Sequence, residues 1–315
     1  MLTIGLFTDS LRELSFESML DWCAAHGIES LEFGTGNFSS APHCKLDSLL
    51  ASENARDDWL GAIAARGLRV AALNCSGNLL DADTARRERS QKIFRDSVLL
   101  SEQFRLNTLV LMSGCPGEPG QNGHYPNWVT AHWQPEYQEL LEWQWREQVI
   151  PFWKESAPFA AEHGIRLAFE MHPGQAVYNP RTLLRLREAG GDNVGVNLDP
   201  SHLFWQGIEP VRVAQALGDV VYHFHAKDCC INAAEMTLNG GLETRTSGVR
   251  SWQHCSPGEG HDESYWRELV NELRRHHFDG ALSIEYESIG TRKEERLQTT
   301  IDMLYRIRSS DYNAA

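Results

Sequence analysis

The residues with the clearest chemical potential follow four apolar runs of the chain. The run 165–169 leads directly into Glu170 and His172. Because side chains alternate along a strand, these two should face the same way at the end of that strand. A carboxylate and an imidazole on one face can form half of a metal site or an acid/base pair.

Three later apolar runs close on the same kinds of side chain. Asp199 follows the run 194–198, His225 follows 220–224, and Glu285 follows 281–284. Any one of these residues could be an ion-pair partner or a helix cap, and Asp199 before Pro200 is a plausible N-cap. Four successive runs that end this way instead favour a shared site.

Three carboxylates and one imidazole suit a borderline-hard divalent cation. We therefore predict one metal ion held by Glu170, Asp199, His225 and Glu285, with Mn²⁺ favoured and Mg²⁺, Co²⁺ or Zn²⁺ as alternatives. No thiolate joins the set, which disfavours a structural zinc. No nucleotide cofactor is expected, because neither phosphate-binding glycine motif occurs in the sequence. A register shift of two residues would exchange the ligands for His223 and Glu287.

His172 is the candidate general base, because the unperturbed pKa of histidine lies close to neutral. A role only in hydrogen bonding to the substrate is the alternative. Lys227 could polarise a carbonyl or pair with Asp228. The predicted substrate contacts are His202, Lys227, Asn74, Glu32 and His261.

The elements that must position these residues alternate between strands and helices. Strands are expected at 2–7, 28–33, 68–73, 108–112, 165–169, 194–198, 220–225 and 281–286. Eight strand–helix units joined by right-handed crossovers favour a closed (β/α)₈ TIM barrel of the α/β class, in which the C-terminal strand ends share one mouth. We predict a single domain over 1–310, a frayed tail at 311–315, and long βα loops after strands four and seven.

Composition narrows the class of protein. The 315 residues carry a formal charge of −14, and no cluster of Lys and Arg indicates a nucleic-acid partner. Seven scattered cysteines favour a reducing cytoplasmic location over a disulfide framework. The beginning of the chain lacks the pattern of a secretion signal, and no apolar stretch reaches the length of a membrane span, so no membrane partner is expected.

Several motifs resemble those of a known superfamily over nearly the whole chain. They are FEMHPG at 169–174, NLDPSHLFWQG at 197–207, VVYHFHAKD at 220–228, SPGEGHDESYW at 256–266 and ALSIEYES at 281–288. They are similar to the xylose-isomerase-like barrels of sugar isomerases and epimerases. The resemblance implies one divalent ion, commonly manganese, on Glu170, Asp199, His225 and Glu285, with His202 as the histidine of a DxxH motif.

The resemblance also implies a chemistry. Epimerases of this superfamily use two metal-bound glutamates as a proton-transferring pair, which would make Glu170 and Glu285 catalytic beside His172. The HxHAKD pattern, the segment 74–78 and the long loops resemble a subgroup that acts on 3-keto-glycosides and includes the catalytic subunits of C-glycoside deglycosidases. We therefore expect a lyase that deprotonates the carbon next to a sugar ketone and β-eliminates the aglycone.

Three alternatives stay open. A keto-sugar isomerase or epimerase could use the same metal site. An apurinic-endonuclease-type phosphodiesterase shares the barrel, but it needs more metal ions and a basic groove, which the net charge of −14 disfavours. A non-catalytic sugar-binding subunit is the third. By family analogy we expect an oligomer, including the case of a hetero-oligomer with a small subunit, and a carbohydrate or glycoside as the small-molecule partner.

Overall fold

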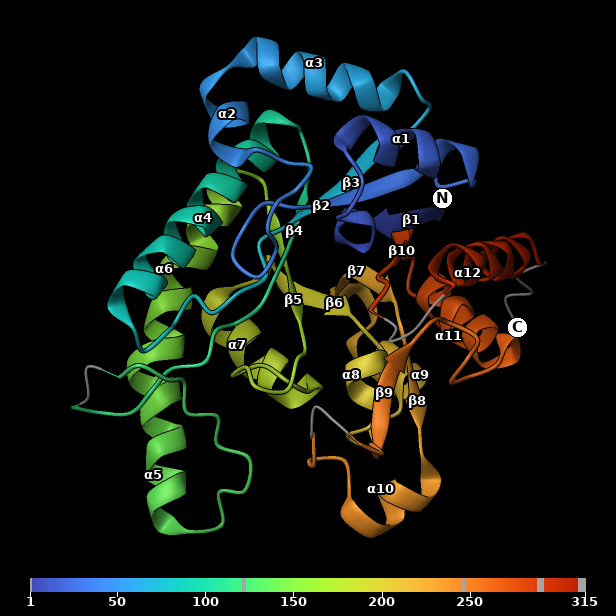
Figure 1. The fold of residues 1–315 in the computed structure, drawn as a ribbon. Helices are drawn as coiled ribbons and strands as arrows, with labels where there is room; N and C mark the ends of the chain where they lie inside the picture. Colours follow the sequence, from blue (N-terminus) through green and yellow to red (C-terminus); the bar gives the residue numbers. More distant parts are fainter. Residues whose placement is uncertain (1, 121–122, 245–247, 288–291, 311–315) are drawn as a thin grey trace. The chain divides into compact units, whose positions relative to one another are not determined.

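The barrel strands of the computed structural model confirm the predicted fold class (Figure 1). The structure describes residues 2–120, 123–244, 248–287 and 292–310. Eight parallel strands close in the order β1-β10-β7-β6-β5-β4-β3-β2. Their bounds are β1 Thr3–Phe7, β2 Ser30–Gly34, β3 Arg69–Asn74, β4 Thr108–Leu111, β5 Arg166–Glu170, β6 Val194–Leu198, β7 Val221–Ala226 and β10 Ala281–Ile284. The predicted tail at 311–315 lies outside the described residues.

The helices between these strands begin where the sequence supplies a cap. Asn179 and Thr182 form a reciprocal capping box at the start of α7, and Asp262 accepts a backbone hydrogen bond at the start of α11. The α-helices are α1 Phe16–Ala25, α2 Leu46–Ala51, α3 Glu53–Ala64, α4 Thr84–Gln103, α5 Pro135–Trp143, α6 Ile150–Glu162, α7 Pro180–Gly190, α8 Ser201–Phe204, α9 Pro210–Leu217, α10 Ala233–Asn239, α11 Glu263–Arg275 and α12 Lys293–Ser309.

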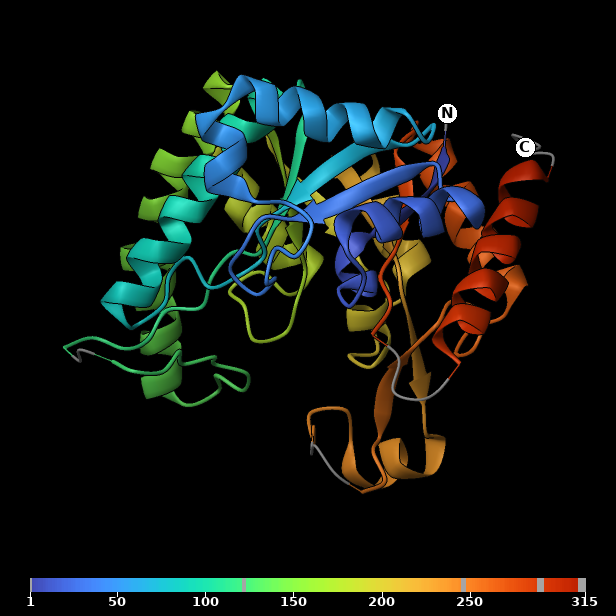
Figure 2. The same ribbon diagram turned by 45° about the horizontal axis from the view of Figure 1, so that its top comes forward.

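The chain divides into two compact units, and the proposed boundaries of a single domain at 1–310 stay a prediction. The first unit comprises Met1–Glu32, Ile63–Arg69 and Leu198–Ala315. In it β10 pairs with β1 and with β7, and Ser283 lies opposite His225 in the latter pair. Helices α11 and α12 of this unit lie side by side (Figure 2).

The second unit comprises Phe33–Ala62 and Val70–Asn197. In it β5 pairs with β4 and β6, and Glu170 lies opposite Asn197. The helical stretch before β5 runs as α5, a π-helical turn at Gln144–Val149, and α6. The helical conformation continues through Pro151, which directly follows the π-helical turn, and through Pro158 inside α6.

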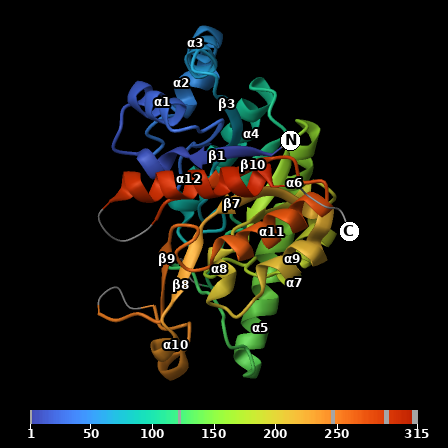
Figure 3. The same ribbon diagram turned by 90° about the vertical axis from the view of Figure 1, so that its right-hand side faces the viewer.

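The segment after β7 is a small folded excursion where the sequence predicts only a loop. Strand β8 (Asp228–Ile231) pairs antiparallel with β9 (Trp252–Cys255), and α10 lies between them in the chain (Figure 3). The ring of Trp252 stacks on Trp205 with 4.7 Å between centroids, which packs the hairpin against α8 and the residue that follows it. Within the described residues, no helix combines the length and apolarity needed to cross a bilayer.

Candidate metal centre

Three of the four predicted metal ligands meet in the first unit. Asp199 directly follows β6, His225 is the penultimate residue of β7, and Glu285 directly follows β10. His225 Nδ1 lies 3.0 Å from Glu285 Oε2 and 3.8 Å from Asp199 Oδ2. One ligand atom from each of the three residues lies within 4.8 Å of the other two. Parallel strands that end at one edge of the barrel bring these side chains together.

The oxygen atoms of this cluster fit a bound cation. Asp199 Oδ1 accepts a hydrogen bond of 2.8 Å from the backbone N–H of Ser201, but the N-cap position of α8 is Pro200, so Asp199 is not the N-cap considered from sequence. Asp199 Oδ2 and Glu285 Oε2 are buried and accept no hydrogen bond of good geometry, and the charged neighbours of Glu285 Oε2 are His225 Nδ1 at 3.0 Å and Lys227 Nζ at 3.2 Å. Buried carboxylate oxygens in native proteins are nearly always satisfied, so two such atoms beside an imidazole nitrogen fit a divalent ion.

The buried ammonium of Lys227 balances part of this negative charge. Its Nζ lies 2.6 Å from Glu287, 3.2 Å from Glu285 and 3.8 Å from Asp199. Burial is the largest influence on the pKa of Asp199 and would raise it, but the charges of His202 and Lys227 hold it below the usual range. Burial likewise opposes ionisation of Glu285, and Lys227 and His225 lower its pKa. Lys227 therefore belongs to the carboxylate cluster.

The opposite edge of the His225 ring faces Glu32 of β2. His225 Nε2 lies 3.0 and 3.1 Å from the two oxygens of Glu32, and His223 Nε2 lies 2.8 Å from Oε2. Burial disfavours the charged forms, but Glu32 and Glu285 raise the pKa of His225 well above its ordinary value. The same imidazoles lower the pKa of Glu32 against its own burial. Glu32, His223 and His225 thus form a second group with metal-ligating atoms in mutual reach.

Two strand registers were considered from sequence, one with His225 and Glu285 as ligands and one with His223 and Glu287. The structure places His225 and Glu285 beside Asp199. His223 turns its Nε2 to Glu32, and Glu287 is about half exposed, with a side-chain exposure of 46%. His202 Nε2 lies 3.5 Å from Asp199 Oδ2, which places the histidine of the DxxH motif at the edge of the cluster.

Glu170 and His172 belong to the second unit. Glu170 is the last residue of β5, is almost fully buried, and accepts a hydrogen bond of 3.2 Å from Asn197. His172 lies beyond the strand in a turn, yet a ring nitrogen stays within 4.8 Å of a Glu170 oxygen. Its Nδ1 contacts the carbonyl oxygen of Pro173.

Asn74 ends β3, and its side-chain oxygen accepts a hydrogen bond from the backbone N–H of Ser76. The metal, base and substrate roles of these residues stay predictions.

His261 is held mainly by structural contacts. Its Nδ1 lies 2.7 Å from Asp228 Oδ1, and its ring stacks on Phe204 at 3.6 Å. Asp228 Oδ2 also accepts from the backbone N–H groups of Gly258, Gly260 and His261, so it fixes the loop that follows the hairpin. A quarter of the His261 side chain is exposed, and its role as a substrate contact stays a prediction.

Comparison with protein families identifies the superfamily. A family model described as a xylose isomerase-like TIM barrel matches residues 20–307. The chain belongs to this family. It is 37% identical to the uncharacterized protein YfiH of Bacillus subtilis (strain 168) over 96% of this chain and 97% of that one. It is 26% identical to an inosose dehydratase of Clostridium botulinum (strain Alaska E43 / Type E3) over 41% of this chain and 42% of the relative.

Solved structures share the fold of this chain at low sequence identity. A probable 3-DHS dehydratase, AsbF of Bacillus anthracis, superposes with a TM-score of 0.67 and 17% identity over 96% of this chain and 98% of that one. The IOLI protein with a bound zinc atom superposes with a TM-score of 0.67 and 16% sequence identity, over 99% of this chain and 100% of that one. A D-psicose 3-epimerase solved in the presence of D-fructose superposes with a TM-score of 0.60 and 14% sequence identity, over 97% of this chain and 98% of that one. At these identities the likeness shows the fold alone.

Two residues that contact predicted site residues of this xylose isomerase-like barrel were not identified from the sequence. Ser283 donates a hydrogen bond of 2.7 Å to Glu32 Oε2, and Asn197 donates to Glu170. Each lies two residues before a predicted ligand, on the same face of its strand. The alternation that selected Glu285 and Asp199 could therefore have found them.

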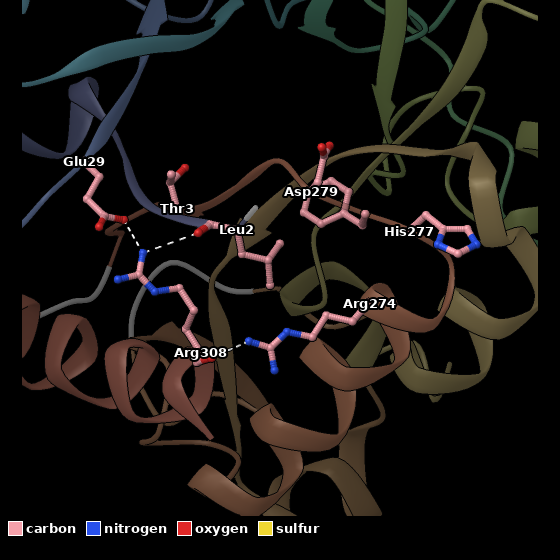
Figure 4. Close-up of a pocket in the computed structure, with 8 residues that line it drawn as sticks. Leu2, Thr3, Glu29, Arg274, His277, Asp279 and Arg308 are labelled. Carbon is pink, nitrogen blue, oxygen red and sulfur yellow. Dashed lines mark hydrogen bonds and ion pairs between the residues drawn. The ribbon is translucent and has the colours of Figure 1, made fainter. Parts of the chain in front are cut away.

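A pocket of about 640 Å³ opens at the N-terminal ends of β1 and β10 in the same xylose isomerase-like barrel (Figure 4). Arg308 of α12 lies against Glu29 and donates to the carbonyl oxygen of Leu2, and Arg274 of α11 donates to the carbonyl oxygen of Arg308. The arginines are thus engaged with protein groups, which indicates that they tie α11 and α12 to the start of β1.

Proposed function

We propose that the chain is a divalent-metal-dependent carbohydrate enzyme that removes the proton next to a sugar ketone. The two buried carboxylate oxygens that face His225 without a hydrogen bond carry this proposal. Asp199, His225 and Glu285 would hold the ion. A bound divalent ion supplies Lewis acidity, which polarises a substrate carbonyl and makes the neighbouring C–H bond more acidic.

We propose Glu170 as the fourth ligand and His172 as the general base. The strands β5, β6, β7 and β10 are consecutive in the barrel, and Glu170 ends β5, while the other proposed ligands lie at or directly after the C-terminal ends of their strands. A carbonyl oxygen only accepts hydrogen bonds, so the contact with Pro173 puts the ring proton of His172 on Nδ1. Nε2 is then the basic nitrogen, suited to accept a proton near neutral pH.

The reaction that we favour is β-elimination from a 3-keto-glycoside. His172 takes the proton from C2, the electrons of that C–H bond form the C1–C2 double bond, and the bond from C1 to the aglycone breaks with its electron pair. Support comes from the inosose dehydratase and the 3-DHS dehydratase, because a dehydratase performs an elimination. Mn²⁺ is the first ion to test, and solved structures of this fold contain zinc or magnesium.

The second candidate is isomerisation or epimerisation of a keto-sugar with the same metal site. The structural likeness to a D-psicose 3-epimerase supports it. In this case the proton returns to the substrate and no group leaves. Lys227, His202 and Asn74 remain the proposed substrate contacts, and an oligomer with or without a small subunit remains a proposal.

Product analysis tests the proposal. Protein loaded with Mn²⁺ is incubated with an aryl 3-keto-glucoside and, separately, with a ketohexose, and products are followed by NMR in D₂O. We expect release of the aglycone together with an unsaturated keto-sugar. Exchange of deuterium into ketohexose with no aglycone release would instead establish the second candidate. Glu170→Gln should stay folded and lose activity; full activity in that variant would remove Glu170 from the site.

A further inference from the structure

The carboxylate of Glu32 joins three strands of the first unit inside the barrel. It accepts hydrogen bonds from Ser283 Oγ at 2.7 Å, His223 Nε2 at 2.8 Å and His225 Nε2 at 3.0 Å. Its side chain has no exposed surface. The substrate contact expected of Glu32 from sequence stays a prediction.

The two nitrogen atoms of His225 face carboxylates on opposite sides of the ring. Nε2 faces Glu32, and Nδ1 faces Glu285 at 3.0 Å and Asp199 at 3.8 Å. A neutral imidazole carries one ring proton, and an ionised carboxylate only accepts. With a divalent ion held by Asp199 and Glu285, the Nδ1 lone pair would face the ion, and the single ring proton would lie on Nε2, where Glu32 accepts it.

We infer that Glu32 is a positioning residue for the metal centre, and that it acts through His225. It fixes the tautomer and orientation of the imidazole and raises its basicity toward a divalent ion. His223 and Ser283 hold the Glu32 carboxylate in place from β7 and β10. The inference rests on the proposed metal site, and it does not depend on which sugar reaction follows.

The competing explanation is a second ion bound directly by Glu32, His223 and His225, whose ligating atoms lie within 4.8 Å of one another. The hydrogen bond from Ser283 to Oε2 favours the positioning role, because the same oxygen already accepts from both imidazoles. The number of ions bound per chain separates the two explanations.

Metal titration of Glu32→Gln tests the inference. The variant keeps the shape of the side chain and removes its charge. We expect one Zn²⁺ per chain in both proteins, measured by competition with a chromophoric chelator, and an affinity about 10- to 100-fold weaker in the variant. Ser283→Ala, the matched control, removes one donor to Glu32 and should weaken binding less. Unchanged affinity in Glu32→Gln, or two ions in the wild type with one lost in the variant, would overturn the inference.

A second measurement needs no variant and therefore holds even if Glu32→Gln fails to fold. In ¹⁵N-labelled wild-type protein loaded with Zn²⁺, His225 should show its proton on Nε2. A proton on Nδ1 would sink the positioning role. Metal binding with the expected tautomer but no reaction with any keto-sugar would remove the proposed function and leave this inference standing.

Discussion

The two ends of β1 and β10 carry similar charged residues that are arranged in opposite ways. At the C-terminal end of β10, Glu285 is 12% exposed and lies 3.2 Å from Lys227, and its buried Oε2 accepts no hydrogen bond of good geometry. At the N-terminal end of β1, Glu29 and Arg308 are partly exposed and hydrogen-bonded. The difference teaches that charge at a strand end indicates function when it is desolvated and left unsatisfied, and stability when it is paired at the surface.

The largest expected effect comes from removing the buried cation. Lys227→Met leaves Asp199 and Glu285 without their ammonium partner, so we expect the metal-free protein to lose about 3–5 kcal/mol of unfolding free energy. Saturating metal should restore part of the loss, because the ion replaces the missing positive charge. Denaturant titrations with and without Mn²⁺ measure both values.

Lys293→Met is the matched control, since Lys293 pairs with the half-exposed Glu13 at 2.6 Å. It should cost less than about 1 kcal/mol, and metal should not change that cost. Equal losses in the two lysine variants would erase the distinction between the buried cluster and a surface pair.

The next effect is the contribution of the metal itself. Mn²⁺ at about 100 times its dissociation constant should stabilise the protein by about 2.7 kcal/mol, and a chelator should reverse the change. Asp199→Asn should lose this metal-dependent increment, whereas Asp279→Asn in the N-terminal pocket should keep it. Thermal unfolding monitored by circular dichroism is the measurement. A metal-dependent increment that persists in Asp199→Asn would show that the ion binds elsewhere.

The smallest effect belongs to the N-terminal pocket. Arg308→Ala should cost about 1 kcal/mol at neutral pH and leave metal affinity unchanged. Burial favours the neutral form of Glu29, but its hydrogen bond with Arg308 lowers its pKa below 4.5. A lowered carboxyl pKa stabilises the folded state above the unfolded pKa and loses that effect as pH falls through the folded pKa. The difference between wild type and variant should therefore shrink on acidification below pH 4.5, as pH-dependent urea titrations would show; a pH-independent difference would contradict this origin.

The barrel could be predicted from sequence because its signals are local. Apolar runs mark each strand, and glycines with positive φ, such as Gly27 and Gly164, follow the ends of helices. Asp199, His225 and Glu285 could then be grouped, because parallel strands share one C-terminal edge. The hydrogen bonds of Glu32 with His223 and His225 could not be predicted from the sequence, because they join side chains that are 191 and 193 residues apart in the chain.

The β8–β9 hairpin was also missed, for a different reason. Its strands are short, and their apolar residues do not alternate over a length that distinguishes strand from loop. The hairpin forms because Trp252 packs on Trp205, a tertiary contact with no local signature. Element boundaries that depend on such contacts lie beyond what periodicity can reveal.

The adjacent positions of Lys227 and Asp228 have a consequence for protein engineering. One side chain enters the carboxylate cluster, and the next anchors the return of the hairpin through the backbone of 258–261. A Cβ atom at Gly260 would lie 2.4 Å from the carbonyl oxygen of Cys229, so this return tolerates only glycine. A foreign excursion grafted between Asp228 and Gly258 must therefore keep both of these anchors, whereas one residue inserted between Lys227 and Asp228 would displace the Asp228 carboxylate from the backbone of 258–261.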